Sequence, residues 1–124
     1  DDADVSKFVV TGLRGSGHVV EFATNSRDGI MLAQNKHFDA LIIDRQLPGG
    51  MDGADMLQKL RSQGVTTPAL FLSGLGQISD WMKGLQSGGD DYLVKPVSMN
   101  EILQRIAAIT APKGPTKEPL AGPG

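Results

Sequence analysis

The sequence predicts an α/β domain in which helices cover both faces of a doubly wound parallel sheet. Short apolar, β-branched segments alternate with segments whose apolar residues recur at helical spacing, and this alternation builds parallel sheets through right-handed crossovers. The chain has 124 residues, of which 40% are hydrophobic. A chain of this length and hydrophobic content can bury one core but is too short for two independent domains.

The first half of the chain predicts two helices and two strands. Apolar residues at three- and four-residue steps predict a helix over residues 5–13. Residues 18–22 then predict a short strand, and polar residues in the next turn predict a helix over about 26–36. Residues 40–43 are continuously apolar, as in a strand covered on both faces, and this strand stops at Asp44.

The second half continues the alternation. It predicts helices over residues 54–60 and 78–86, and strands over 69–72 and 92–94. A last helix over residues 98–109 is the best supported, because Ser98 can cap it and Glu101 lies near its positive end. This gives four strands in total.

The C-terminal end of the chain differs in composition from the rest. Residues 1–110 predict one domain, whereas residues 111–124 are rich in proline and glycine and predict a flexible tail or linker. No apolar run approaches the roughly 20 residues that cross a bilayer, and no basic leader opens the chain. We therefore expect a cytoplasmic protein without a membrane contact.

Composition excludes several classes of function. The chain has no cysteine, which excludes disulfides, thiolate chemistry and zinc–thiolate sites. Its formal net charge of −2 offers no overall field that would attract nucleic acid. We expect no nucleic-acid contact by this domain itself.

Polar residues follow three of the predicted strands. Asp44, Ser73 and Lys95 each stand where a strand ends, and Asp1 and Asp2 open the first helix. Parallel sheets bring such ends to one edge. Carboxylates, a hydroxyl and a lone ammonium together suit a hard divalent cation and a phosphoryl group, and a carboxylate can itself be the nucleophile.

Each of these residues also has a purely structural interpretation. Asp44 can cap a neighbouring turn, and Asp1 can cap the first helix. Ser73 is common in turns, and Tyr92 is usually a core ring with a hydrated hydroxyl. The shared sheet edge is what favours the functional interpretation.

Taken in order, the motifs resemble the receiver domain of bacterial two-component response regulators, most of all the OmpR/PhoB winged-helix group. The motifs are Asp1-Asp2, Leu41-Ile42-Ile43-Asp44, Leu47-Pro48-Gly49, Met51-Asp52-Gly53, Ser73-Gly74, Gly88-Gly89-Asp90-Asp91-Tyr92 and Lys95-Pro96. The resemblance covers residues 1 to about 110 and implies a flavodoxin-like receiver fold. It also implies a central strand before Asp1, which is missing from this chain, so we expect a gap in the sheet.

The resemblance implies a phosphorylation site. Asp44 would accept a phosphoryl group from the phosphohistidine of a sensor histidine kinase. Mg²⁺ would be held by Asp1, Asp44 and the main-chain oxygen of Gln46. Catalysis would be limited to self-phosphorylation and self-dephosphorylation, so we do not expect an enzyme in the usual sense.

The resemblance also implies a switch and an interface. Ser73 and Lys95 would contact phosphoryl oxygens, and Tyr92 would turn inward behind the displaced Ser73. The bond between Lys95 and Pro96 resembles a cis peptide of the family. The face formed by the fourth helix, last strand and last helix would change conformation and control an output such as transcription. The same face would form a homodimer through Asp91, Glu101 and Arg105.

Two alternatives stay open. A Mg²⁺-dependent phosphohydrolase with an aspartyl nucleophile also places Asp at the end of a parallel strand, although Gln46 stands where such enzymes usually carry a second acid. A pseudo-receiver that binds partners without being phosphorylated would be the outcome if the acids hold Mg²⁺ too weakly.

Overall fold

The computed structural model describes residues 2–23, 25–46, 51–74, 76 and 78–111, with side chains from Lys7 onward. The elements in this part of the chain are α1 (Asp2–Gly15), α2 (Ser26–Asn35), β1 (Leu41–Asp44), α3 (Gly53–Ser62), β2 (Ala69–Ser73), α4 (Ile78–Gln86), β3 (Asp91–Val94) and α5 (Met99–Thr110). The five predicted helices and three of the four predicted strands are confirmed. The predicted tail lies outside the described residues from residue 112 onward.

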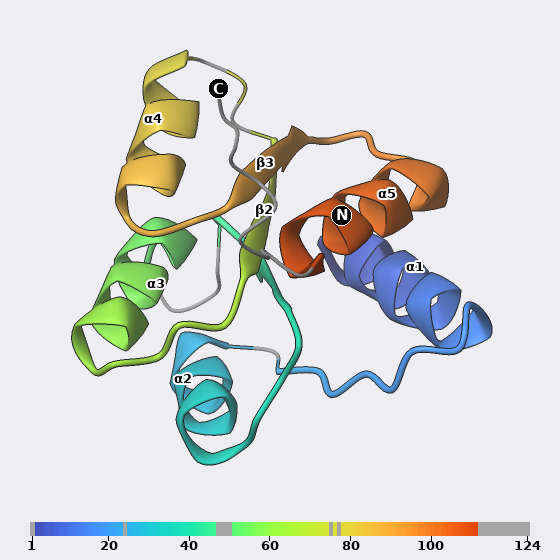
Figure 1. The fold of residues 1–124 in the computed structure, drawn as a ribbon. Helices are drawn as coiled ribbons and strands as arrows, with labels where there is room; N and C mark the ends of the chain where they lie inside the picture. The colour runs from blue at the N-terminus through green and yellow to red at the C-terminus, as the bar shows by residue number, and fades with distance from the viewer. Residues whose placement is uncertain (1, 24, 47–50, 75, 77, 112–124) are drawn as a thin grey trace, which may run out of the picture.

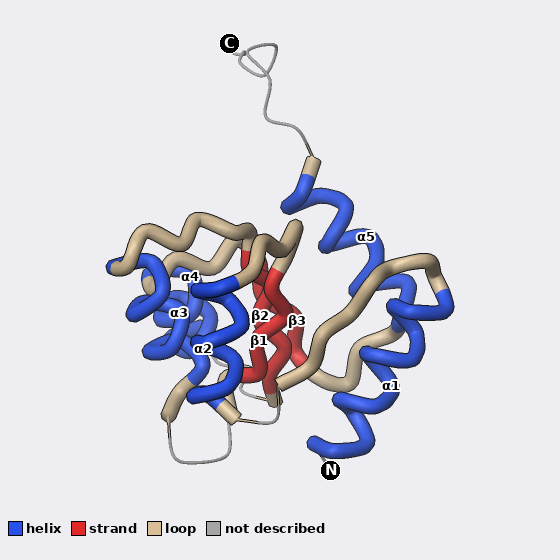
Figure 2. Tube along the Cα trace, turned by 90° about the horizontal axis from the view of Figure 1, so that it is seen from below, coloured by secondary structure: helices blue, strands red, loops and turns tan. Residues whose placement is uncertain are grey.

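The three strands form one parallel sheet in the order β1-β2-β3. Asp44 of β1 pairs with Leu72 of β2, and Ser73 of β2 pairs with Val94 of β3. Helices α1 and α5 lie on one face of the sheet, and α2, α3 and α4 lie on the other (Figure 1 and Figure 2). The predicted α/β class and parallel sheet are therefore confirmed.

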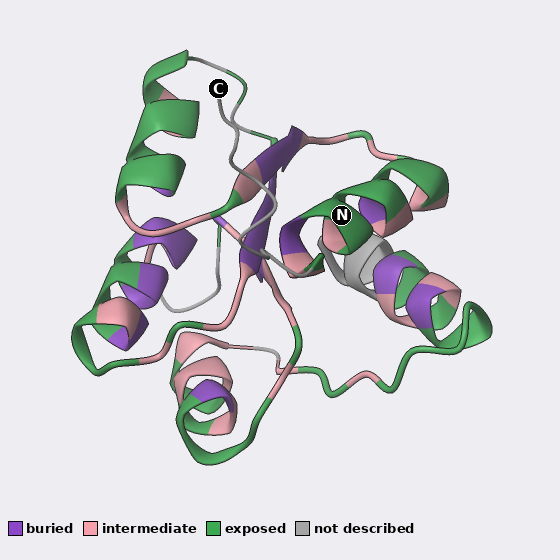
Figure 3. Cartoon of the chain, in the orientation of Figure 1, coloured by how far each residue is buried: buried purple, intermediate pink, exposed green. Residues whose placement is uncertain are grey.

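The strand β2, which lies in the middle of the three described strands, divides the core into two clusters. Every residue of β2 is buried, as expected for a strand with helices on both faces (Figure 3). The cluster toward α1 and α5 contains Val9, Leu13, Leu70, Leu72, Leu93, Ile102 and Ile109. The cluster on the opposite face contains Ile43, Ala54, Met56, Leu57, Ala69, Phe71 and Tyr92.

The predicted strand at residues 18–22 is wrong. Residues 18–23 run between α1 and α2 without regular structure, because a strand needs a hydrogen-bonded neighbour and no described strand lies beside them. Instead, Arg14 of α1 donates to the main-chain oxygen of Val20 at 2.9 Å. Each described strand is hydrogen-bonded to its neighbour in the sheet. The expected gap is therefore not found between the described strands.

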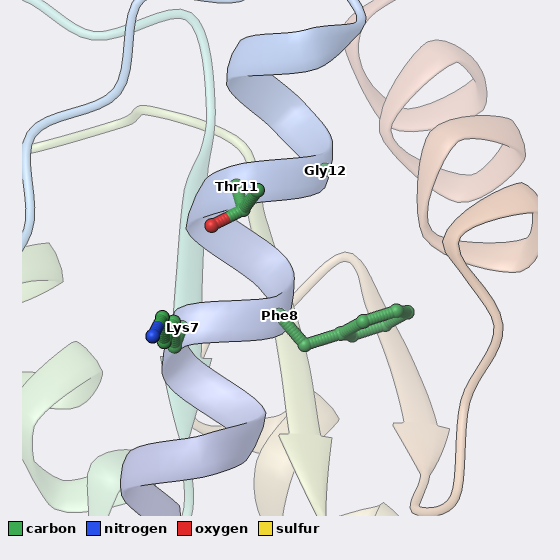
Figure 4. A pocket seen from close by; sticks show the side chains of 4 residues that line it. All are labelled: Lys7, Phe8, Thr11 and Gly12. Carbon is green, nitrogen blue, oxygen red and sulfur yellow. The ribbon is translucent and has the colours of Figure 1, made fainter.

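One side of α1 is only lightly covered. An open hollow of about 450 Å³ lies there, lined by Lys7, Phe8, Thr11 and Gly12 (Figure 4). The ring of Phe8 projects from the helix, and the residue is 46% exposed. The other side of α1 carries the buried Val9 and Leu13 into the core.

Polar caps begin three of the helices in the described region. Ser98 caps α5 in a capping box, because its hydroxyl accepts from the Glu101 N–H while the Glu101 carboxylate accepts from the Ser98 N–H, both at 3.1 Å. Asn25 caps α2 and Asp52 caps α3. None of the helices described is long and apolar enough to span a membrane.

Candidate functional site

Polar residues gather at the carboxyl ends of the three strands. Asp44 is the last residue of β1, Ser73 is the last of β2, and Lys95 directly follows β3. The strands are parallel, so these ends share one edge of the sheet. The Lys95 N–H donates to the Ser73 carbonyl at 2.8 Å, which extends the ladder to Lys95. One edge therefore carries a carboxylate, a hydroxyl and an ammonium.

The carboxylate of Asp44 is held by two donors. Nζ of Lys95 lies 2.7 Å from Oδ2, and the Gln46 N–H donates to Oδ1 at 2.8 Å. The Asp44 side chain is 24% exposed and that of Lys95 is 15% exposed. Hydrogen bonds to a charged carboxylate are short and strong, and two of them from different directions fix its plane. Asp44 is thus oriented while part of it stays open to solvent.

Ser73 is positioned by strand pairing. It is completely buried, although it ends its strand at the edge where Asp44 lies. Its register partner is Val94, which directly precedes Lys95. The ladder between β2 and β3 therefore sets where the Ser73 and Lys95 main chains lie relative to each other. The peptide bond between Lys95 and Pro96 is cis, as the resemblance implies.

The predicted metal ligands lie only partly within the described residues. Asp44 and Gln46 are described, whereas Asp1 is not. A carboxylate and a main-chain carbonyl are oxygen donors of the type Mg²⁺ prefers, and Mg²⁺ is commonly bound through one or two carboxylates with waters completing its shell. No three Asp, Glu or His side chains of the described part form a metal-holding group. The two described residues of the predicted ligand set therefore offer oxygen donors of the type that fits Mg²⁺.

Gly53 brings the start of α3 against the acceptor strand. A side chain at this position would overlap the main-chain oxygen of Asp44, so only glycine permits the approach. The Gly53 N–H donates to the Arg45 carbonyl at 3.0 Å. Next to this bond, Gln46 and Asp52 form an antiparallel bridge. These contacts hold the main chain of Gln46 beside the start of α3.

Arg45, which comes directly after Asp44, is buried and fully engaged. Its side chain is 3% exposed, and Nε and Nη2 donate to the two carboxylate oxygens of Asp52 at 2.6 and 2.8 Å. Nη1 donates to the main-chain oxygen of Asp80 in α4 at 2.7 Å and to the hydroxyl of Tyr92 at 3.3 Å. One guanidinium thus links the end of β1 to α3, α4 and β3.

The sequence interpretation missed this role of Arg45. A usable signal was present, because side chains alternate along a strand and Ile43 points into the cluster beside α3. Arg45, two residues on, points the same way. A cation directed into the interior requires an acid, and Asp52 at the start of the next helix is the first acid that follows Arg45 in the chain.

Asp52 collects donors from three elements. In addition to Arg45, it accepts from the Ala54 N–H at 2.8 Å and from Nζ of Lys83 in α4 at 3.2 Å. The hydrogen bond from Arg45 is the main reason that the pKa of Asp52 lies well below its ordinary value. The same bond raises the pKa of Arg45. Both side chains therefore stay charged across the physiological range.

Tyr92 lies between the sheet and α4. Its ring centroid is 5.9 Å from that of Phe71 and 6.2 Å from that of Trp81. Gly84 of α4 allows the helix to approach, because a Cβ there would stand 2.9 Å from the tyrosine ring. Tyr92 is 7% exposed, and its hydroxyl accepts from Arg45. The predicted switch residue thus touches both α4 and the segment after Asp44.

The charges predicted for a dimer face bind within the chain. Nη1 of Arg105 lies 2.9 Å from Oδ2 of Asp91, and these side chains are 46% and 24% exposed. Glu101 completes the capping box of Ser98. All three acid and base residues lie on β3 or α5, as expected from the sequence.

The sequence matches the family model for the response regulator receiver domain over residues 1–107. Among solved structures, the receiver domain of the Francisella response regulator 1452 is similar with a TM-score of 0.82 and 32% identity, covering 89% of this chain and 90% of that one. The receiver domain of sensor histidine kinase PA1611 from Pseudomonas aeruginosa PAO1, solved with a magnesium ion in its active site cleft, has a TM-score of 0.77 and 25% identity, covering 88% and 91%.

Two transcriptional regulatory proteins of Escherichia coli K12 are also similar. HprR is 39% identical over 87% of this chain, and CusR is 38% identical over 88%. Each match covers 48% of the relative, so the chain spans about half the length of these regulators. The resemblance to the OmpR/PhoB group is confirmed. The chain belongs to the family of receiver domains of two-component response regulators.

Proposed function

We propose that this receiver accepts a phosphoryl group on Asp44 from the phosphohistidine of a sensor histidine kinase. The observation that carries the proposal is the ion pair between Asp44 and Lys95, 2.7 Å apart at the carboxyl edge of a parallel sheet. This pair combines an oriented, partly exposed nucleophile with a cation ready to meet negative charge. Family membership supplies the class of donor.

In the proposed step, one oxygen of Asp44 bonds to phosphorus while the bond between phosphorus and the imidazole nitrogen breaks. The ammonium of Lys95 balances charge on a phosphoryl oxygen, and the hydroxyl of Ser73 donates to another. Mg²⁺, when held by Asp44, Asp1 and the Gln46 main-chain oxygen, supplies further positive charge there. Attack by water on the acyl phosphate returns the carboxylate, so the domain modifies only itself.

We propose that phosphorylation changes the face formed by α4, β3 and α5. Ser73 would move toward the phosphoryl group. The ring of Tyr92, which is already only 7% exposed, would follow it rather than turn in from solvent. The altered face would control an output such as transcription, the process named for HprR and CusR. The charged residues of this face, which would support a homodimer, are Asp91, Glu101 and Arg105.

The proposal extends to domain limits and location. Residues 1–110 form the receiver, and residues 111–124 serve as a tail or linker to an output region. We expect the domain in the cytoplasm, where a sensor kinase would transfer its phosphoryl group. We propose no contact with nucleic acid by the receiver itself.

Intact-mass measurement with acetyl phosphate and Mg²⁺ tests the proposal. The wild type should gain the mass of one phosphoryl group, and Asp44→Asn should gain none. Asp39→Asn is the matched control, because the Asp39 carboxylate is 95% exposed before β1, and it should behave as the wild type. Modification of Asp44→Asn would contradict the proposal. Turnover of a generic phosphate ester would instead support the phosphohydrolase, and an unmodified wild type the pseudo-receiver.

A further inference from the structure

We propose that Arg45 is a positioning residue that transmits the state of Asp44 to helix α4. The inference rests on the proposed function, because it concerns how the fold responds once Asp44 becomes occupied. Contacts of the Arg45 side chain form the path by which a change at the Asp44 carboxylate reaches α4.

The first step of the path runs from Asp44 to Asp52. Oδ1 of Asp44 accepts from the Gln46 N–H at 2.8 Å, so a group added to the carboxylate competes for that donor. Gln46 in turn lies opposite Asp52 in their antiparallel bridge. A shift of the Gln46 main chain is therefore passed to Asp52, the partner of Arg45.

The second step runs through the guanidinium of Arg45. Its two donors to Asp52 form a planar fork, which fixes the orientation of the whole group. The remaining nitrogen reaches the main-chain oxygen of Asp80 at 2.7 Å and the hydroxyl of Tyr92 at 3.3 Å. The fork is rigid, so movement of Asp52 turns the nitrogen that contacts α4.

The third step concerns how α4 is held. Its early turn is bound by Arg45 through Asp80, and its later part by the contact of Lys83 with Asp52 at 3.2 Å. Gly84 is the buried residue of this helix. Its large apolar side chains are 44% to 74% exposed, namely Ile78, Trp81, Met82 and Leu85. Little apolar burial anchors α4, so the polar contacts of Arg45 and Asp52 have a large share in setting its position.

The chain contains its own reporter for this movement. Trp81 is the single tryptophan, lies on α4 and has its ring centroid 6.2 Å from that of Tyr92. Its fluorescence therefore responds to displacement of α4 relative to the sheet. Phosphoryl adduct and Trp81 emission are measured in the same samples after treatment with acetyl phosphate and Mg²⁺, so the emission change is obtained per mole of adduct.

The decisive variant is Arg45→Met, which keeps a long apolar stem and removes every donor. We expect the emission change per adduct to fall at least about threefold relative to the wild type. The matched control is Arg61→Met, since Arg61 is also a part-buried arginine but binds the carbonyls of Val65 and Gly88. The control should keep the wild-type emission change per adduct.

The outcomes separate this inference from the proposed function. A wild-type emission change per adduct in Arg45→Met would overturn the inference, as would a wild type that forms the adduct without any change in emission. Absence of the adduct in the wild type would overturn the proposed function and the inference with it. If Arg45→Met does not fold, Lys83→Met removes the second contact of α4 at a half-exposed side chain. A partial loss of the response is then expected, and an unchanged response would overturn the inference.

Discussion

At the scale of single residues, the cation that pairs with Asp44 and the cation that follows Asp44 in the chain have different surroundings and different roles. Lys95 pairs with a partly exposed carboxylate at the sheet edge, where its ammonium is a compact charge. Arg45 is buried and spreads its donors over three partners. The proposed chemistry therefore depends on Lys95, and the arrangement of the elements around it depends on Arg45.

Replacing Lys95 should slow the chemical step. We expect Lys95→Met to lower the rate of adduct formation from acetyl phosphate on the order of a hundredfold, since a donor aimed at developing charge is lost. Time-resolved intact mass measures the rate. Lys59→Met, on the exposed surface of α3, is the control and should leave the rate unchanged. A wild-type rate in Lys95→Met would contradict the role assigned to the ammonium.

The charge on Asp52 should contribute stability that depends on pH. Arg45 holds the pKa of Asp52 below its ordinary 3.8 in the folded chain, so ionised Asp52 stabilises the fold above that value. The contribution is lost as pH falls through the folded pKa. We expect Asp52→Asn to lower the free energy of unfolding at neutral pH, and its difference from the wild type to shrink below about pH 4. Urea denaturation across pH checks this, and a difference that grows on acidification would contradict it.

The position of a residue can be predicted from the sequence when nearby residues determine it, and not when distant contacts do. The placement of Asp44, Ser73 and Lys95 at one sheet edge was predictable, because each stands at the end of a strand or directly after it, and strand ends can be predicted from the apolar run before them. The role of Arg45 depends on Asp80 and Tyr92, which lie 35 and 47 residues further along the chain. No local pattern specifies which main-chain oxygen a side chain will meet across a fold.

At the scale of elements, α3 shows how a helix start is fitted to the site. Asp52 caps the helix while binding Arg45, and Gly53 packs against Asp44. Asp52 thus accepts hydrogen bonds both from a main-chain amide of the helix and from the buried Arg45. The end of β1 and the start of α3 are therefore expected to move as a unit.

A side chain at Gly53 should disturb this unit. We expect Gly53→Ala to lower the free energy of unfolding by about 1–3 kcal/mol, because its Cβ would overlap the Asp44 main chain. Adduct formation should slow as well, since the acceptor strand must shift. Chemical denaturation and intact mass measure the two effects. Gly15→Ala, where an added Cβ meets nothing within 4 Å, is the control. Equal effects of the two substitutions would contradict the close approach.

Elements whose ends are marked by neighbouring residues were predicted correctly. The strand predicted at residues 18–22, which lacks a described neighbouring strand, was not. Ser98 and Glu101 mark the start of α5 through contacts within a single turn, which the sequence contains in full. Residues 18–22 have the β-branched and aromatic residues typical of a strand, but strand formation depends on a neighbour elsewhere in the fold. Pattern alone could not supply that neighbour.

At the scale of the whole molecule, the two faces of the sheet have different helices and different proposed roles. Helices α1 and α5 pack on one face, while the opposite face carries α4, whose half-exposed Trp81 lies beside Tyr92. The fold class was predictable from the alternation of strands and helices, which is a property of the entire chain. How α4 is held was not predictable, since it depends on contacts between distant segments.

Phosphorylation should change the association of this molecule. We expect beryllofluoride with Mg²⁺ to shift the domain toward a dimer in size-exclusion chromatography, because the proposed switch acts on the face of α4, β3 and α5. Arg105→Glu should prevent the shift, since it replaces the cation that pairs with Asp91 on that face. Arg27→Glu, on exposed α2, is the control. An unchanged monomer in the wild type would count against the interface.

The position of the phosphoryl group tests the central claim most directly. The wild type is treated with acetyl phosphate and Mg²⁺, reduced with borohydride so that an acyl phosphate becomes an alcohol, and mapped by peptide mass spectrometry. We predict reduction at residue 44 and at no other carboxylate. Labelling at Asp52 or at another acid, with residue 44 unchanged, would contradict the assignment of Asp44 as the acceptor.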